Sequence, residues 1–264
     1  MGEDHNDIKI LKVLHIKCTL NAGGGCMIVY RLAQALKDKY RFDWMTYSLT
    51  GHDWAYKFNQ IGSVIRYFPG PKGHKYWNNL CLYFKYIKHI RKNGYKIVHL
   101  HTEHPSAIRF IICAYFGGAK KRIMHSHNNS AIGVYNNWHT KLRKWLMDIF
   151  VTDYIACSKE AAEWLFSPRG ARKAVIIKNG LNTELYQFSL SKRTEIRNEL
   201  GLNDNQYVIG HIGRFVPQKN HIFLLETFQE VLRIDTNARL LLLGSGPMEK
   251  EIYEKIKAMG IEKK

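Results

Sequence analysis

The chain has 264 residues, of which 45% are apolar and 12% aromatic, and its six prolines are scattered. This length allows one or two domains with a core in each, and the composition excludes disordered, collagen-like and low-complexity proteins. Lys and Arg number 40 against 22 Asp and Glu, a net charge of +18 with the histidines neutral. Such an excess predicts an anionic partner, which could be nucleic acid, an acidic membrane surface or a phosphorylated ligand.

The cysteines and the N-terminal sequence indicate the compartment. The five cysteines are odd in number, widely spaced and include no C-x-x-C pair, so we expect reduced, mostly buried thiols rather than a disulfide framework. The first ten residues, MGEDHNDIKI, are acidic and polar, unlike a secretion signal. The longest apolar stretch, residues 107–119, is too short to span a bilayer and includes Arg109. These features predict a cytoplasmic protein.

Short β-rich runs alternate with helical stretches over residues 1–185. The expected strands are 10–18, 42–49, 63–69, 96–102, 121–127, 153–158 and 174–180. Helices are expected over 27–40 and 76–94, and from near Pro105, Asn137 and Lys159. This alternation predicts an α/β domain built on a parallel, doubly wound, Rossmann-like sheet.

The same rhythm restarts after a linker-like segment, residues 183–206. A strand is expected over 207–214, a helix over 220–234, a strand over 238–244 and a helix over 247–260. A sheet of two parallel strands cannot cover both of its faces. We therefore predict a complete first domain, residues 1–185, and an incomplete second Rossmann-like domain, residues 186–264.

Most of the positive charge belongs to the first domain. Residues 1–185 contain 28 Lys and Arg and 12 Asp and Glu, whereas residues 186–264 contain 12 and 10. The helix expected over 76–94 carries apolar residues at helical spacing and basic residues between them: Leu80, Tyr83, Phe84, Ile87 and Ile90, with Lys85, Lys88, Arg91 and Lys92. A solvated face on a core helix and a membrane-surface helix explain this pattern about equally well. Nucleic acid is disfavoured because zinc-finger and RNP-type motifs are missing.

Ligands of open parallel sheets bind beyond the carboxyl ends of the strands, so the residues that follow each strand are candidates for a site. The first strand runs into Gly23, Gly24 and Gly25 just before a helix, where backbone N–H groups can approach an anion. A tight turn explains these glycines equally well.

Histidines follow two of the strands. His99, His101 and His104 stand at the end of the fourth strand, and His125 and His127 at the end of the fifth. Because no cysteine or paired carboxylate completes a zinc set, we expect no metal site here. Hydrogen-bonding or proton-transferring imidazoles in a cleft fit the pattern better.

The first strand of the second domain runs into GRFVPQKN, residues 213–220. Arg214 and Lys219 lie five residues apart in this strand-to-helix loop. The planar fork of Arg and the point charge of Lys, near a helix N-terminus, would suit a diphosphate. A pair of exposed surface cations is the alternative.

Six segments share their order and spacing with a known family. They are the glycine loop at 23–25, RIMHSHNNS at 122–130, DYIACSKEAAEWLF at 153–166, KNGLNTELYQF at 178–188, GRFVPQKN at 213–220 and LLLLGSGPMEKEI at 240–252. On these segments the chain resembles the glycosyltransferases of family 4, which have the GT-B fold, and is most similar to bacterial capsular or exopolysaccharide members. The resemblance covers nearly the whole chain.

The resemblance implies site residues in both domains. Arg214 and Lys219, next to Gly213, match the pair that clamps the diphosphate of the sugar donor. Gly244 and Gly246 match the turn that approaches the nucleotide. Fixed cations of this kind would stabilise the charge that develops on the phosphate oxygens as the glycosidic bond breaks.

In the first domain, Gly23, Gly24 and Gly25 match the loop that faces the inter-domain cleft, near the acceptor and the phosphate. His127 matches the histidine beside the transferred sugar, and we expect it to contact that sugar in the catalytic site. Members of the family use no nucleotide-bridging metal and generally retain the anomeric configuration. The expected co-substrate is a UDP-sugar, with no further cofactor.

The sequence departs from the family pattern at the end of the first domain and in the second domain. Lys178 replaces the proline before the NG turn, and Asn182 replaces the Asp after it. Glu254 and Glu262 stand eight residues apart but lack the glycine-containing context of the glutamate pair that contacts donor sugar and ribose. The resemblance therefore predicts a C-terminally truncated member of the family.

Three functions stay open at this point. The first is transfer of a sugar from a nucleotide-sugar to a lipid-linked or polysaccharide acceptor in capsule or exopolysaccharide synthesis. The others are a non-catalytic remnant that binds acceptor or membrane, and another GT-B enzyme such as a sugar-nucleotide epimerase. The expected partners are a nucleotide-sugar donor, a glycan or lipid-linked acceptor and an anionic membrane surface, with peripheral attachment to the inner face of the plasma membrane.

Overall fold

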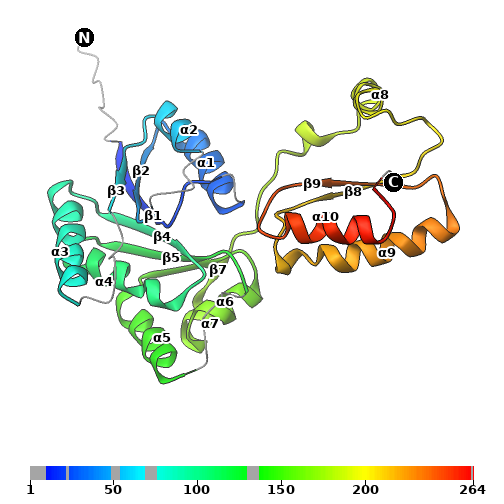
Figure 1. Cartoon of the computed structure of the whole chain (residues 1–264). Helices are drawn as coiled ribbons and strands as arrows, with labels where there is room; N and C mark the ends of the chain where they lie inside the picture. Colours follow the sequence, from blue (N-terminus) through cyan, green and yellow to red (C-terminus); the bar gives the residue numbers. More distant parts are fainter. Residues whose placement is uncertain (1–9, 22–23, 49–53, 69–75, 130–136, 263) are drawn as a thin grey trace, which may run out of the picture. The chain divides into compact units, whose positions relative to one another are not determined.

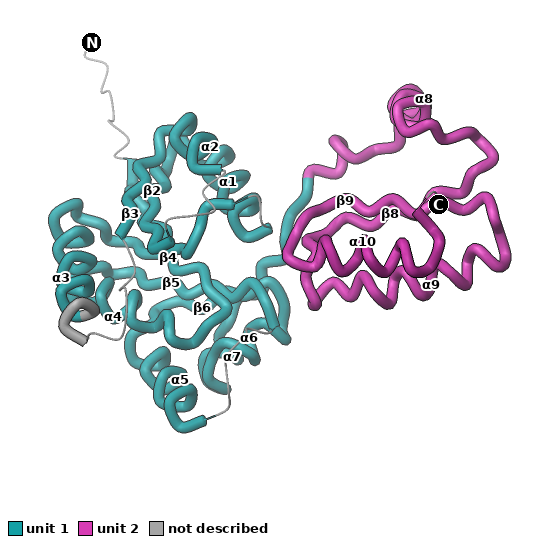
Figure 2. Tube along the Cα trace, viewed as in Figure 1, with its two compact units in different colours: residues 1–181 teal, residues 182–264 magenta. Residues whose placement is uncertain are grey.

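The computed structural model describes residues 10–21, 24–48, 54–68, 76–129, 137–262 and 264. The chain folds into two compact units, residues 1–181 and residues 182–264 (Figure 2). The division lies four residues before the boundary placed at 185 from the sequence. All six tryptophans precede residue 182 and therefore belong to unit 1.

Unit 1 is built on a seven-stranded sheet in which every neighbouring pair is parallel. Its strands are β1 (Leu11–Lys17), β2 (Tyr40–Thr46), β3 (Ile65–Tyr67), β4 (Ile97–Thr102), β5 (Lys121–Ser126), β6 (Asp153–Ala156) and β7 (Val175–Ile176), in the order β3-β2-β1-β4-β5-β6-β7. This arrangement confirms the predicted Rossmann-like parallel sheet. It also brings the carboxyl ends of β1, β4 and β5 together at one edge.

Helices cover both faces of this sheet (Figure 1). They are α1 (Gly24–Leu36), α2 (Ala55–Gln60), α3 (Tyr76–Lys92), α4 (Ile108–Phe116), α5 (Trp138–Phe150), α6 (Lys159–Leu165) and α7 (Pro168–Lys173), with a short 3₁₀ turn η1 (Pro105–Ala107) before α4. Helices α5, α6 and α7 begin behind capping side chains, those of Asn137, Ser158 and Ser167, which satisfy free N–H groups of the first turn.

Alternation along the central strands separates two cores. Leu14 and Ile16 of β1 and Leu100 of β4 point to the face covered by α3 and α4, within the larger hydrophobic cluster. The neighbouring residues point to the opposite face, where Trp44 of β2 packs in a second cluster with Val29 of α1. Burial of both faces accounts for the high apolar content of these strands.

Unit 2 holds two parallel strands, β8 (Val208–Ile212) and β9 (Arg239–Leu243). Helices α9 (His221–Ile234) and α10 (Glu249–Ala258) pack on one face of this pair (Figure 1), around a small core that includes Leu225, Phe228 and Ile252. Every residue of β8 and β9 keeps some solvent exposure. The strand–helix–strand–helix order is the one that the sequence predicts.

Two expectations need correction. The linker-like segment contains a helix, α8 (Leu190–Glu199), and a 3₁₀ turn, η2 (Thr183–Tyr186); α8 lacked a signal because none of its residues is buried. The thiols are not mostly buried: Cys18 and Cys81 are exposed, Cys157 is half-buried, and only Cys26 and Cys113 are buried.

Helix α3 has two apolar faces. Its buried residues include Leu82, Tyr86 and Ile90, whereas Leu80 and Phe84 of the expected apolar stripe are 50% and 63% exposed. A groove of about 290 Å³ lies between α3 and α4, lined by Leu80, Tyr83, Phe84, Ile87, Arg109, Ile112, Cys113 and Phe116. The helix therefore uses one apolar face for the core and leaves a second at the surface. None of the helices in the described part of the chain is long and apolar enough to cross a bilayer.

Candidate active site

Five imidazoles form a continuous stack on one face of the unit 1 sheet. The parallel register places His15 of β1 opposite His99 of β4, and His101 of β4 opposite His125 of β5. Because residues two apart in a strand share a face, His127 continues the stack just beyond β5. Ring centroids of successive members lie 4.1 to 5.4 Å apart.

Hydrogen bonds connect three of these rings. His15 Nδ1 and His101 Nε2 are 2.9 Å apart, and His101 Nδ1 and His127 Nε2 are also 2.9 Å apart. In each pair one ring donates its N–H and the other accepts, so neutral imidazoles suffice. The expectation of hydrogen-bonding imidazoles agrees with this arrangement.

Burial keeps these imidazoles neutral. Desolvation, followed by the charge of His125, lowers the pKa of His15 to about 3. Desolvation and then the ammonium of Lys17 lower the pKa of His125 to about 4, and desolvation with His125 and Lys17 lowers that of His127 to about 3. The pKa values of His99 and His101 also fall well below 6.5, again chiefly through burial.

Gly24 and Gly25, expected in a loop, form the first turn of α1, which lies against His127. A Cβ added to Gly25 would be 3.6 Å from the His127 ring and 3.5 Å from Lys17 Nζ, whereas a Cβ on Gly24 would meet no atom within 4 Å. Helix α1 begins at Gly24, so the Lys17 ammonium and the His127 ring both lie beside its first turn. Gly23 lies outside the described residues.

Sequence reasoning placed one histidine wrongly and missed two residues. His104 stands apart from the stack because its Nδ1 accepts hydrogen bonds from Ser106 N and Oγ at the start of η1. The two missed residues are His15, which is the first ring of the stack, and Lys17, whose ammonium lies near the His127 end of it. The signal was present: both lie in β1, two residues apart, and alternation directs them to the same face.

The candidate donor loop of unit 2 presents two exposed cations. Arg214 and Lys219 follow β8 and precede α9, with the 3₁₀ turn η3 (Pro217–Lys219) between them. Within the described residues neither side chain takes part in an ion pair. Asn220 adopts a left-handed conformation (φ 48°) and turns the chain into α9. Two free cations beside a helix N-terminus suit a phosphate ligand.

Backbone contacts lock the loops after β8 and β9 together. Phe215 N donates to Ser245 O over 2.9 Å, and Met248 N donates to Phe215 O over 3.1 Å. A Cβ on Gly244 would lie 1.9 Å from Gly213 O, and one on Gly246 would lie 2.4 Å from Phe215 O. Gly244 and Gly246 are therefore required by close backbone approach, which a side chain would prevent.

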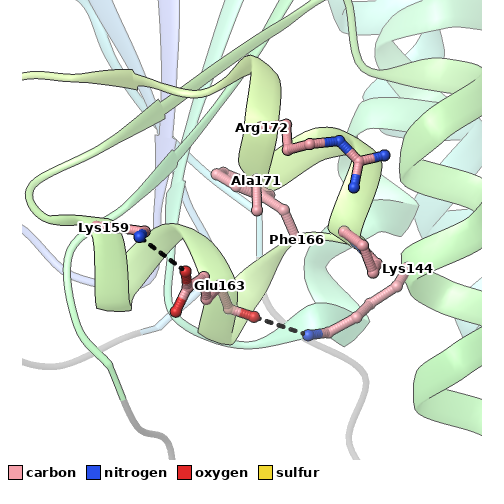
Figure 3. Close-up of a pocket in the computed structure, with 7 residues that line it drawn as sticks. Lys144, Lys159, Glu163, Phe166, Ala171 and Arg172 are labelled. Carbon is pink, nitrogen blue, oxygen red and sulfur yellow. Dashed lines mark hydrogen bonds and ion pairs between the residues drawn. The ribbon is translucent and has the colours of Figure 1, made fainter.

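A separate cavity of about 390 Å³ opens between α5, α6 and α7 and is lined by Lys144, Lys159, Glu163 and Arg172, among others (Figure 3). Lys144 Nζ donates to the carbonyl oxygens of Trp164 (2.7 Å) and Glu163 (3.3 Å), near the end of α6. Lys159 lies 3.9 Å from the carboxylate of Glu163. Lys144 and Lys159 already have partners in α6, whereas Arg172 takes part in no ion pair among the described residues, so the cavity offers one free cation where the Arg214 loop offers two.

Comparison with known families assigns the chain. A family model described as Glycosyltransferase Family 4 matches residues 22–185, more than half of the sequence. The chain belongs to glycosyltransferase family 4. A second model, Glycosyl transferases group 1, matches residues 192–264 of this family 4 chain. The resemblance drawn from the six sequence segments is thereby confirmed.

Relatives and solved structures agree with this assignment. EpsF of Bacillus subtilis (strain 168) is 27% identical over 259 residues, which cover 95% of this chain and 66% of EpsF. The capsular polysaccharide biosynthesis glycosyltransferase CapH of Staphylococcus aureus is 23% identical, covering 96% of this chain and 67% of CapH. The chain thus spans about two thirds of the length of these relatives.

The crystal structure of Anabaena HepE in complex with UDP and glucose superposes with a TM-score of 0.75 at 18% identity. The superposition covers 96% of this chain and 67% of HepE. HepE has also been solved with UDP-glucose. At this identity the likeness establishes the fold, which is the GT-B architecture that the sequence predicts.

The histidine stack makes unit 1 sensitive to acid. Above pH 6.5 the imidazoles are neutral in both states, whereas below it the unfolded chain binds protons that the folded chain cannot. The free energy of unfolding should therefore fall as the pH drops below about 6.5, by up to about 1.4 kcal/mol per pH unit for each histidine that stays neutral. Urea unfolding followed by tryptophan fluorescence in metal-free buffer measures this in unit 1 alone.

Replacing one member of the stack tests the origin of that pH dependence. His125→Gln should flatten the decline between pH 7 and 5, while His139→Gln, on the exposed side of α5, should keep the wild-type profile. Equal stability of the wild-type protein at pH 7 and 5 would contradict the prediction.

The glycine contacts of unit 2 give a second prediction. Gly244→Ala should destabilise unit 2 by about 1–3 kcal/mol, because its Cβ would overlap Gly213 O and force the two loops apart. Hydrogen exchange should then quicken in residues 208–216 and 239–246. Gly210→Ala in β8 is the matched control, since a Cβ there meets nothing within 4 Å. Wild-type exchange rates in Gly244→Ala would refute the backbone-contact explanation.

Proposed function

We propose that this protein transfers a sugar from a nucleotide-sugar, a UDP-sugar, to a lipid-linked or polysaccharide acceptor in capsule or exopolysaccharide synthesis. The observation that carries the proposal is the match of both units to glycosyltransferase models, with two cations at the exit of β8 that form no ion pair within the described part of the chain. The complexes of the structural neighbour HepE with UDP and UDP-glucose support a uridine nucleotide as the donor carrier.

Unit 2 binds the donor in this proposal. Arg214 and Lys219 hold the diphosphate, and the two interlocked turns that contain Gly213, Gly244 and Gly246 face the nucleotide. The charge that develops on the leaving diphosphate is stabilised by these two fixed cations. They do the work of a nucleotide-bridging metal, so transfer proceeds without one and without a further cofactor.

Unit 1 supplies the groups near the transferred sugar. His127 contacts that sugar as the catalytic-site histidine, and its neutral state suits hydrogen bonding to a hydroxyl group. Gly24 and Gly25 form the first turn of α1, and with Gly23, which precedes them in the sequence, they supply N–H groups to a phosphate or an acceptor in this proposal. Transfer retains the anomeric configuration.

In this proposal unit 1 binds the acceptor at the inner face of the plasma membrane. Helix α3 combines the exposed apolar residues Leu80 and Phe84 with the cations Lys85 and Lys88, beside the apolar groove shared with α4. Apolar contact and attraction to anionic lipid head groups add together at such a surface. A lipid-linked acceptor would lie in the same membrane.

A donor screen tests the proposed reaction. The protein is incubated with radiolabelled UDP-sugars and lipid-linked acceptors, in the presence and absence of EDTA. We expect label in the lipid fraction for one donor, an anomeric configuration that matches the donor, and no loss of transfer with EDTA. Absence of transfer from every donor, both in this chain and in a version extended to the length of its relatives, would refute the proposal.

Substitution of the two loop cations tests the donor site. Arg214→Ala and Lys219→Ala should each weaken UDP binding about 10- to 100-fold by calorimetry, because each removes a charge-assisted contact to phosphate. Arg233→Ala is the matched control, since Arg233 is an exposed cation at the other end of α9, whose 14 residues span about 21 Å. Unchanged affinity in both loop variants would remove the assignment.

Charge reversal on α3 tests the membrane surface. Wild-type protein should co-sediment with vesicles that contain anionic lipid, and salt should weaken this binding. Lys85→Glu combined with Lys88→Glu should reduce it at least tenfold, because each cation contributes about 1 kcal/mol near an anionic surface. The control is Lys37→Glu with Lys39→Glu, two exposed lysines at the end of α1. Equal binding to neutral vesicles would contradict the prediction.

A further inference from the structure

The imidazole stack contains more ligands than the proposed reaction uses. His127 is the one member with a role in transfer, and His15, His99, His101 and His125 have none. Two groups of three histidines each bring one ring nitrogen per residue to within 4.8 Å of the others: His15, His99 and His101, and His101, His125 and His127. Such clusters of nitrogen donors from separate strands are typical of transition-metal sites.

Unpaired nitrogen atoms point to a missing ligand in the second group. His125 is 5% exposed, yet neither of its ring nitrogens has a hydrogen-bond partner among the described residues. His15 Nε2 and His99 Nε2, deeper in the stack, are likewise buried without a partner. Buried polar atoms are normally satisfied, so each unpaired nitrogen calls for an explanation. A metal ion would use the lone pair of an imidazole nitrogen that now contacts no donor.

Against the expectation drawn from the sequence, we propose that His101, His125 and His127 bind one divalent transition-metal ion. This group is preferred over the deeper one because His127 is only half-buried, which gives an ion a way in from the edge of the sheet. All three ligands belong to unit 1, so the site is complete within that unit.

The hydrogen bonds around His101 already orient it as a ligand. His101 Nε2 is 2.9 Å from His15 Nδ1, and this contact holds the His101 ring with Nδ1 towards His127. Metal-binding histidines commonly use their second nitrogen in this way. In the tautomer in which His101 donates from Nε2 to His15, His127 Nε2 carries the proton that His101 Nδ1 accepts. When an ion replaces that contact, the His127 proton moves to its own Nδ1. Both imidazoles stay neutral and no proton is released.

The donor set selects the class of ion. Three neutral nitrogen ligands without a carboxylate suit Zn²⁺, Cu²⁺ or Ni²⁺, whereas Mg²⁺ and Ca²⁺ prefer oxygen. Lys17 Nζ and the His127 ring lie 3.5 and 3.6 Å from the same point beside Gly25, so the ammonium repels any cation bound here. This repulsion excludes cations that the three imidazoles would bind only weakly. A three-histidine set also leaves a fourth position for water on Zn²⁺.

Metal titration of the chain without a histidine tag tests the proposal. Calorimetry should show one Zn²⁺ bound per chain and no heat with Mg²⁺. Co²⁺, added as a spectroscopic substitute, should give the visible absorption of a tetrahedral nitrogen site. Failure of the wild-type protein to bind Zn²⁺ would overturn the proposal, and so would a Co²⁺ spectrum of a fully hydrated ion.

Variants then locate the ion. His125→Gln and His127→Gln should each weaken Zn²⁺ binding at least tenfold, with folding checked by tryptophan fluorescence. His139→Gln is the control and should bind as the wild type does. Lys17→Met should tighten binding at least about threefold by removing the repelling charge, a gain that misfolding cannot produce. Wild-type affinity in both ligand variants, or in Lys17→Met, would overturn the assignment to this edge.

Discussion

Strand register at the centre of unit 1 decides which side chains meet at the carboxyl ends of its strands. Pairing of β1 with β4 and of β4 with β5 sets His15 opposite His99 and His101 opposite His125. A shift of one residue in either pair would turn the imidazoles into the apolar core and the core leucines outward. The same register brings Lys17 and His127 to one point beside the start of α1. Every function considered for this edge rests on that alignment.

The candidate site of unit 1 consists mainly of side chains, and that of unit 2 mainly of backbone. Unit 1 uses side chains: buried, neutral imidazoles that are only partly hydrogen-bonded, an arrangement that costs stability and is typical of functional sites. Unit 2 uses the backbone: two loops interlocked through glycines, with the exposed cations Arg214 and Lys219 added at the surface. Rigid backbone turns and preorganised charge both serve phosphate binding, because neither needs to rearrange when the ligand arrives.

The strands and most of the candidate site residues could be predicted from the sequence, for physical reasons. Apolar runs ending in polar residues located the strands, and the strand exits located Gly25, His127, Arg214 and Lys219. Alternation along β1 could have placed His15 and Lys17 on one face, but the stack itself could not be predicted, because the register of β1 with β4 depends on pairing across more than 80 residues. Helix α8 escaped detection because it buries nothing. The roles of the site residues remain predictions that the substitutions above address.

The strand order of unit 1 also bears on how the chain folds during synthesis. β1 pairs with β2 on one side, but its other partner, β4, begins only at Ile97. A ribosome adding about 5–20 residues per second would leave that edge of β1 open for several seconds. Open apolar edges invite wrong pairing between nascent chains. Folding of the nascent chain should therefore depend on chaperones that shield the open edge of β1 until β4 has been synthesised.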